Sequence, residues 1–252
     1  KPYRERISRT DIQGGGLFSI FLDPEDTSIA NSGGTVDVRQ LQVEIPDEAR
    51  EEYEEALEDA EDGDHDEAAE RLERAVELSP EYYDAWIDLG GQYNILERFE
   101  DAKNAYEQAG ELNPNGFLVH LNLGALRYQE GERLRAFVES AMEAFEAYAA
   151  AHTSLERAIE LDPFSSDARF YLGATLYRMT LYDESETLLQ SVIEIEAQHA
   201  QSRLMLINVY ARLQRYEDAL DQANTFLDEN DDAPERSAIE RVKSQLEGTL
   251  GR

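Results

Sequence analysis

The stretch Trp86-Ile87-Asp88-Leu89-Gly90-Gly91-Gln92-Tyr93 decides the fold, because its pattern recurs along the chain. A step of 34 residues separates three matching pairs: Leu89 and Leu123, Gly90 and Gly124, and Pro80 and Pro114. A fixed period of this length is typical of solenoids built from helical hairpins, in which each hairpin buries its apolar face only against its neighbours. The repeat predicts an all-α solenoid that acts by binding, since such stacks present extended surfaces to partners.

From residue 47 to residue 250 the apolar residues follow a helical period, which predicts about five hairpins and a capping helix. Markers of the five hairpins are Gly63, residues 83–116, Gly131, Leu172 and Leu206. We expect the first hairpin to turn at Gly63 and the third at Gly131. The amphipathic segment from about Pro234 to Leu250 is predicted to cap the stack.

The third hairpin breaks the period. Gly124 and Gly173 are 49 residues apart rather than 34, so 15 residues are inserted. The segment 132–161 contains no Gly or Pro and carries a continuous apolar stripe, which predicts one long helix of roughly 45 Å. The alternative is a turn near residues 149–153 that restores ordinary packing.

Residues 1–46 lack the helical repeat pattern and are predicted to form a β-rich segment with strands at about 16–22 and 35–45. The residues expected to pair these strands are Leu17, Phe18, Ile20, Phe21, Val36, Val38, Leu41 and Val43. Two strands alone are marginal in water. We therefore expect them to dock on the solenoid, to complete a domain whose remainder is absent, or to pair with another molecule.

The amino-acid composition limits the classes of partner that the protein is expected to bind. The net charge is −32, from 55 acidic and 23 basic residues, which disfavours nucleic acid and anionic membrane surfaces as partners. The chain has no cysteine, which excludes disulfides, thiolate catalysis and Cys-ligated zinc. No apolar run approaches the length of a membrane span, so no membrane insertion is expected.

No catalytic, cofactor-binding or metal-binding residue is predicted. The four histidines are His65, His120, His152 and His199. They lie near no Ser or Asp that suggests a triad, and packing roles are predicted for His120 and His152. Residues 62–67 look briefly like a calcium loop, but the glycine comes second rather than sixth, so a repeat turn with solvated acids is predicted. The glycines at 14–16 precede no Lys-Ser/Thr and form no phosphate loop.

The signature residues are Trp86, Leu89, Gly90, Tyr93, Ala102, Tyr106, Ala109 and Pro114. This pattern resembles the tetratricopeptide repeat family over roughly residues 47–250, with Tyr106 where the family has Phe. The fourth hairpin departs from the pattern, with Ser185 for the first Ala and Ala197 for Pro. Residues 1–46 resemble the end of the immunoglobulin-like domains that precede such repeats in some exported bacterial proteins. That second resemblance implies an extracytoplasmic or extracellular bacterial setting rather than a cytoplasmic one.

The tetratricopeptide resemblance implies a concave groove lined by the first helix of each hairpin. Its residues here would be Tyr53, Leu57, Ile87, Asn94, Leu121, Tyr128, Phe170, Tyr177, Arg178, Leu204, Asn208 and Arg212. The set is apolar and aromatic with a few polar anchors, and it lacks the Lys and Asn cluster with which some members clamp a carboxylate terminus. A helix or an extended peptide is therefore the expected ligand. The alternative is that several of these side chains pack within the stack.

Together these features predict a non-enzymatic protein–protein interaction scaffold. The sharper expectation is self-assembly into a homo-oligomer or a head-to-tail polymer, through the N-terminal strands and the solenoid ends. The alternative is a monomeric adaptor that binds a peptide or helix of a different protein in its groove.

Overall fold

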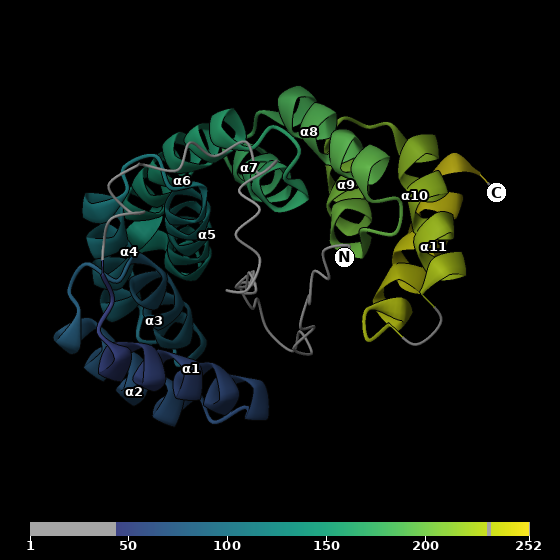
Figure 1. Cartoon of the computed structure of the whole chain (residues 1–252). Coiled ribbons are helices and arrows are strands. Elements are labelled where there is room, and N and C mark those ends of the chain that lie inside the picture. The colour runs from purple at the N-terminus through teal and green to yellow at the C-terminus, as the bar shows by residue number, and fades with distance from the viewer. Residues whose placement is uncertain (1–43, 231–232, 252) are drawn as a thin grey trace. The chain divides into compact units, whose positions relative to one another are not determined.

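A computed structural model of the chain describes residues 44–230 and 233–251. Every regular element in these ranges is helical, which confirms the all-α solenoid (Figure 1). The helices are α1 (Asp47–Asp62), α2 (His65–Leu78), α3 (Tyr83–Ile95), α4 (Phe99–Leu112), α5 (Phe117–Leu134), η2 (Val138–Ser140, a 3₁₀ turn), α6 (Ala141–Leu161), α7 (Ser166–Arg178), α8 (Tyr182–Ile195), α9 (Ala200–Arg212), α10 (Tyr216–Glu229) and α11 (Arg236–Leu250). The predicted strand-pairing residues lie outside the described residues.

The chain divides into two compact units. The first holds α1 to α4 and α5 as far as Glu130, together with residues 160–163. The second holds residues 131–159 and α7 to α11. In the first unit α1 packs on α2, α2 on α3 and α3 on α4, and in the second α7 to α11 follow the same order of neighbours. Each helix thus packs mainly against its neighbours in sequence, as the repeat predicts.

In the second and fourth hairpins the first helix approaches the second closely at a glycine. In the first unit a Cβ added at Gly90 would lie 2.4 Å from the Tyr106 ring, which is fully buried. In the second unit a Cβ at Gly173 would lie 2.9 Å from Leu189. Ser185 adds a hydrogen bond to this contact, because its buried hydroxyl donates to the Gly173 carbonyl at 2.7 Å. The serine that departs from the repeat signature therefore keeps the two helices close.

The turn inside four hairpins places one residue in the left-handed region. The four residues share one repeat position: Gly63 (φ 87°), Glu97 (φ 58°), Thr180 (φ 65°) and Gln214 (φ 59°). After α3, for example, Glu97 N–H donates to the Asn94 carbonyl at 3.1 Å and Arg98 N–H to the Tyr93 carbonyl at 2.8 Å. Such bonds satisfy carbonyls at the helix end and reverse the chain.

The third hairpin differs from both forms predicted for it. Gly131 does not form the predicted turn, because it lies inside α5, which continues to Leu134. The turn comes at residues 135–140, so the prediction of one long helix over 132–161 is wrong. The alternative prediction, a turn at 149–153, is also wrong because α6 runs through these residues. As a result α5 has 18 residues and α6 has 21, against 13 in α3 and 14 in α4.

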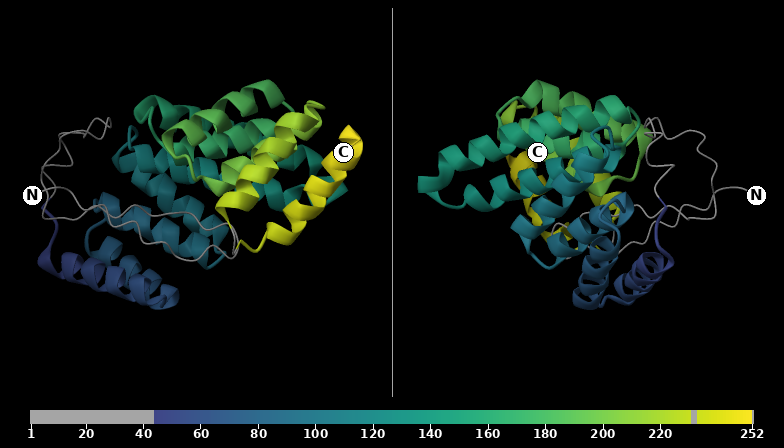
Figure 2. Two further views of the ribbon diagram at one scale, coloured as in Figure 1. Left: turned by 90° about the vertical axis from the view of Figure 1, so that its right-hand side faces the viewer. Right: turned by 60° about the vertical axis from the view of Figure 1, so that its left-hand side comes forward.

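The fold-back buries apolar side chains that a single helix would have left in water. Around the turn, the end of α5 and the beginning of α6 lie side by side in the teal hairpin (Figure 2). Ala144, Ala147 and Tyr148 are buried, and a Cβ added at Gly131 would lie 2.5 Å from the Tyr148 ring. Gly131 therefore serves the close approach of two helices rather than a turn.

Helix α11 closes the second unit, as predicted for a capping helix. Ile239 and Leu246 are buried in a core that includes Leu206 and Phe226. Residues on the opposite side of α11, such as Arg241 and Ser244, are exposed and polar. A polar outer face on a terminal helix is what a capping element of a repeat stack requires.

We expect Gly90→Ala to lower the free energy of unfolding by about 1–3 kcal/mol, because the added methyl collides with a buried ring that has no room to move. Gly248→Ala is the matched control, since a Cβ at this helical glycine of α11 meets nothing within 4 Å. Urea denaturation followed by circular dichroism measures both. Equal midpoints for Gly90→Ala and the parent chain would contradict the close contact.

Candidate partner-binding faces

Four side chains of the first unit form a polar, aromatic cluster, here called the tyrosine–aspartate face: Tyr53, Tyr82, Asp84 and Asp88. Tyr53 comes from α1, Tyr82 immediately precedes α3, and the two aspartates lie one turn apart on α3. The rings of Tyr53 and Tyr82 have their centroids 4.8 Å apart. The Tyr53 hydroxyl donates to Asp88 Oδ2 at 2.7 Å. The face therefore joins consecutive hairpins through their first helices.

Both carboxyl groups of this face have shifted pKa values. Asp88 is only 6% exposed, and burial raises its pKa to about 7; the hydrogen bond from Tyr53 opposes this rise, and nearby Asp84 adds to it. Asp84 reaches solvent, but the protein packed around its carboxyl group still raises its pKa through desolvation. Burial, with Asp88 and Asp84 close by, also raises the pKa of Tyr53 well above its ordinary value. A desolvated acid without a counter-charge is unusual in a structural core.

Asn94 provides a further buried acceptor on α3. It is 6% exposed, and its Oδ1 atom has no hydrogen-bond partner among the described residues. It lies on the same face of α3 as Ile87, two helical turns further along. Most buried polar atoms in proteins are hydrogen-bonded, so an acceptor without a donor among the described residues is unusual.

The other predicted groove residues of the first unit are distributed between surface and core. Ile87 and Leu121 are buried, and with Asn94 they fit the alternative in which predicted residues pack within the stack. Leu57 and Tyr128 are half-buried. Tyr53 is the predicted residue that takes part in the tyrosine–aspartate face.

The second unit carries a ring pair at the matching repeat positions. Phe170 of α7 lies 5.1 Å from His199, measured between ring centroids. His199 also caps α9, because its Nδ1 accepts a hydrogen bond from Ser202 N–H at 3.1 Å. Burial lowers the pKa of His199, while Glu196 and Asp167 oppose that shift. The pKa of Asp167 is raised by burial. This face therefore pairs an acid with an imidazole, whereas the first unit pairs acids with tyrosine.

Tyr177, Arg178 and Arg212, all predicted groove residues, come together in the second unit. Arg178 binds both carboxylate oxygens of Glu132, at 2.6 and 2.7 Å, and its guanidinium lies 5.3 Å from the Tyr177 ring centroid. Burial raises the pKa of Glu132, but hydrogen bonds from Arg178 and Tyr148 outweigh it and leave the pKa lowered. Arg212 is exposed, and its Nε donates to Tyr177 Oη at 3.5 Å.

The last two predicted groove residues lie on α9. Leu204 is half-buried. Asn208 is exposed, and its side-chain amide donates to the carbonyl oxygen of Leu204 at 3.1 Å. They add no further polar cluster to the second unit.

The turn of the third hairpin carries exposed apolar side chains. Phe137 is 59% exposed, Met142 70% and Phe145 51%; we call these three residues the apolar tip. Phe137 and Phe145 belong to the stripe that predicted the long helix, so the sequence located them but not their exposure. The apolar tip is a second candidate contact surface.

The sequence analysis missed a recurring contact. Six residues after three of the proline positions, a side-chain nitrogen donates to the carbonyl at that position: Trp86 Nε1 to Pro80 (3.0 Å), His120 Nε2 to Pro114 (2.9 Å) and Arg203 Nη2 to Ala197 (2.7 Å). His120 and Arg203 therefore substitute for the signature tryptophan as donors. The constant spacing of six residues is the sequence feature from which this contact could have been predicted.

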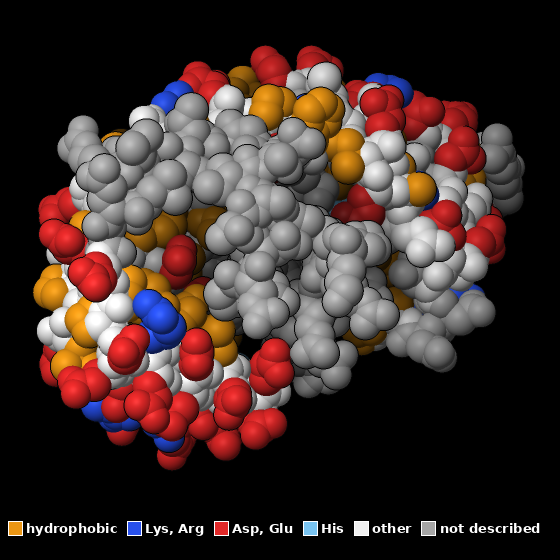
Figure 3. All heavy atoms as spheres, viewed as in Figure 1, with side chains coloured by type: hydrophobic (Ala, Val, Ile, Leu, Met, Phe, Trp, Pro, Cys, Tyr) orange, Lys and Arg blue, Asp and Glu red, His pale blue; other side chains and the backbone are white. Residues whose placement is uncertain are grey.

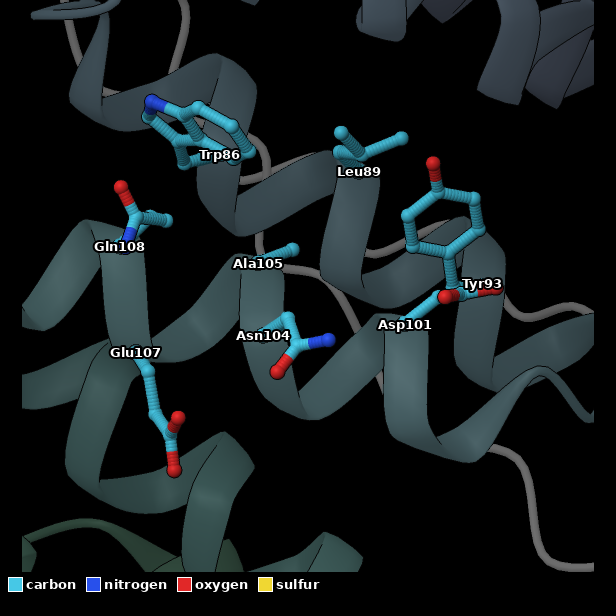
Figure 4. Close-up of a pocket in the computed structure, with 8 residues that line it drawn as sticks. All are labelled: Trp86, Leu89, Tyr93, Asp101, Asn104, Ala105, Glu107 and Gln108. Atoms are coloured by element: carbon cyan, nitrogen blue, oxygen red, sulfur yellow. The ribbon is translucent and has the colours of Figure 1, made fainter.

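A shallow depression of about 380 Å³ lies between α3 and α4 (Figure 4). Its lining residues are Trp86, Leu89, Tyr93, Asp101, Asn104, Ala105, Glu107 and Gln108. None of the predicted groove residues lies in it. The Tyr93 hydroxyl donates to Glu73 at 2.6 Å, so this ring joins neighbouring hairpins.

The remaining histidines have local partners. His65 Nδ1 lies 2.9 Å from Gln92 Oε1, and His152 Nδ1 lies 3.2 Å from Glu156. Within residues 44–230 and 233–251 no group of three or more His, Cys, Asp or Glu side chains is placed to hold a metal ion. In the same ranges no helix is long and apolar enough to cross a membrane.

We expect Asp88→Asn to remove a penalty that grows with pH. The folded-state pKa of Asp88 is raised to about 7 from about 3.9 in an unfolded chain. The favourable contribution of Asp88 to the free energy of unfolding is thus complete below about pH 4 and is lost as the pH rises through 7. Relative to the parent, Asp88→Asn should gain stability between pH 4 and 8, by at most about 4 kcal/mol at about 1.4 kcal/mol per pKa unit.

Urea denaturation at a series of pH values measures this difference. Glu77→Gln, a change of equal charge at an exposed residue of α2, is the control and should run parallel to the parent. A pH-independent difference between Asp88→Asn and the parent would contradict the buried, raised acid.

Comparison with known proteins agrees with the repeat pattern. Two models of the tetratricopeptide repeat family match the chain, one over residues 59–120 and the other over residues 140–195 and 175–234. Together these matches cover more than half of the sequence. A search of curated protein sequences finds no match.

Solved structures share the fold at low sequence identity. A MamA fragment from Desulfovibrio magneticus RS-1 is 14% identical with a TM-score of 0.64, over 76% of this chain and 99% of that one. TTC0263 from Thermus thermophilus is 17% identical with a TM-score of 0.60, over 79% and 98%. YrrB, described as a TPR protein with an unusual peptide-binding site, is 21% identical with a TM-score of 0.58, over 75% and 90%. The chain belongs to the tetratricopeptide repeat family.

Proposed function

We propose that this protein is a non-enzymatic scaffold that binds a segment of another protein along the first helices of its hairpins. Tetratricopeptide repeat proteins are protein-interaction scaffolds. The observation that carries the proposal is the tyrosine–aspartate face, where two helices of one stack gather half-buried aromatic rings at the edge of the core beside two acids without a counter-charge among the described residues. The peptide-binding site named for YrrB supports a peptide as the ligand.

The chemistry of this face suits a peptide. Tyrosine rings offer a large contact area at a small cost in side-chain entropy, because few torsions are fixed on binding. The buried acceptor of Asn94 has no donor among the described residues, and binding that opens the packing around it would supply one. Extended peptides and helices bring such donors, in their backbone or side chains. The rings and the acceptor together favour binding over a purely structural role.

The second candidate function is self-assembly, and the apolar tip favours it. Phe137, Met142 and Phe145 are each more than half exposed, and association would remove them from water. The outer faces of the described end helices offer no comparable area: α1 exposes Glu48 and Glu51, and Figure 3 shows acidic side chains gathered over α1 and α2. Within this candidate, the tip is therefore a better contact than the ends.

Peptide binding is tested by selecting ligands for the full chain from a phage-displayed library of random peptides. We expect recurrent peptides, whose affinity falls at least about tenfold in Tyr82→Ala, a loss of about 1.4 kcal/mol. Ile195→Ala, an exposed apolar residue of α8, is the control and should bind like the parent. Fluorescence polarisation with synthetic peptides gives the affinities. Failure to enrich any peptide over bare support would sink the proposal.

Self-assembly is tested by light scattering coupled to size-exclusion chromatography. The chain has a mass of 28.6 kDa, and we expect a larger species that Phe137→Ser/Met142→Ser/Phe145→Ser converts to monomer. Leu78→Ser/Ile195→Ser removes exposed apolar side chains elsewhere and should leave the mass unchanged. A monomeric parent chain at high concentration rules out this second function.

A further inference from the structure

We infer that the tyrosine–aspartate face binds the arginine or lysine side chains of a basic segment in a partner protein. This inference rests on the proposed function and names the chemical class of its partner.

The carboxylates of this face have no cationic partner in the part of the chain that the structure describes. Among the described residues no Arg or Lys forms an ion pair with Asp84 or Asp88, and the one hydrogen bond to Asp88 comes from the Tyr53 hydroxyl. Arginines elsewhere in this unit are fully engaged with acids. Arg71, for example, binds Asp59 at 2.6 Å and also contacts Glu55 and Glu52. The two carboxylates of the face are thus left without a counter-charge.

One arginine of α1 acts electrostatically on this face, but its hydrogen bond is made elsewhere. Arg50 of α1 acts on Tyr82, whose pKa it lowers against a larger rise from burial. Its Nη2 atom nevertheless donates to the Ile45 carbonyl at 3.3 Å, and its Nη1 lies 3.9 Å from Asp47. Arg50 therefore forms no ion pair that would balance the negative charge of Asp84 and Asp88.

The arrangement of these groups fits a guanidinium or ammonium group. A cation over the Tyr53 and Tyr82 rings gains cation–π attraction, which is strongest where water is excluded. Asp84 reaches solvent and provides a direct carboxylate contact, while the buried charge of Asp88 lies below it. Burial raises the pKa of Asp88, and no cation among the described residues opposes this rise.

The extent of the face fits a segment rather than a single ion. Asn94 lies ten residues after Asp84 on α3, roughly 15 Å along the helix axis. Its Oδ1, unpaired among the described residues, would accept from a ligand donor at that distance from the carboxylates once binding opened the packing around it. An extended peptide of about five residues spans this length. The net charge of −32 further attracts basic segments and speeds their encounter with the chain.

The experiment is the peptide selection repeated on the full chain and on Asp84→Asn/Asp88→Asn. Peptides selected by the parent should contain Arg and Lys at more than twice their frequency in the unselected library. Selection on the variant should lose this enrichment, and a basic peptide selected by the parent should bind the variant at least about tenfold more weakly. Asparagine keeps the shape of each side chain and still accepts from Tyr53, and a urea midpoint verifies folding.

Glu77→Gln/Glu111→Gln is the matched control. It removes the same charge from exposed residues of α2 and α4 that share one repeat position, and it should retain the preference for basic peptides. An equal loss in the control would reveal nonspecific attraction to an acidic protein and overturn the inference. Selected peptides without enrichment in Arg and Lys would also overturn it, although the proposed function would stand. If no peptide is selected, the proposed function fails as well.

The other possible occupant is the chain's own basic stretch, which contains Lys1, Arg4, Arg6 and Arg9 and lies outside the described residues. Arg4→Gln/Arg6→Gln/Arg9→Gln tests it by competition. If a partner segment is the ligand, this variant should bind the selected basic peptide within about twofold of the parent. A tenfold gain in affinity would assign the face to the chain's own stretch and overturn the inference.

Discussion

The close approach of the two helices in each hairpin is the constraint on which the rest of the structure depends. Gly90 faces the ring of Tyr106, Gly173 faces Leu189, and a side chain at either glycine would collide with a buried neighbour. Once the two helices of a hairpin are fixed in this way, the residues of the first helix have fixed directions. Those that do not face the second helix contact the next hairpin or remain available to partners. The binding faces are therefore a consequence of the glycine contact.

The third hairpin shows that the close contact outweighs the position of the turn. Gly131 occupies the repeat position at which Gly63, Glu97, Thr180 and Gln214 adopt positive φ. It keeps a helical conformation instead and receives the ring of Tyr148. The sequence could not reveal this, because three of the four real turns use ordinary residues at that position. The presence or absence of glycine at this position therefore does not predict a turn. No local sequence feature indicated that the chain reverses direction at residues 135–140.

The sequence predicted the scaffold and part of the faces. The 34-residue step predicted the hairpins, and the resemblance to the tetratricopeptide repeat family implied groove positions for Tyr53 and Phe170 on the first helices. Their ring partners, Tyr82 and His199, immediately precede the next first helix and belong to no groove position. The hydrogen bond from Tyr53 to Asp88 joins residues 35 positions apart, and only the packing of consecutive hairpins brings them together. Faces built between repeats need the tertiary structure, whereas features within one repeat do not.

The same scaffold positions carry different chemistry in the two units. One ring pair consists of two tyrosines with uncompensated acids, and the other consists of phenylalanine and a histidine beside Asp167. In the second unit Arg178 is neutralised by Glu132, whereas Arg212 is exposed and makes one long hydrogen bond to a tyrosine. The first face is therefore complementary to cations, and the second offers a cation of its own. Because the contacts at Gly90 and Gly173 hold their helices whatever these positions contain, the faces are free to differ in charge.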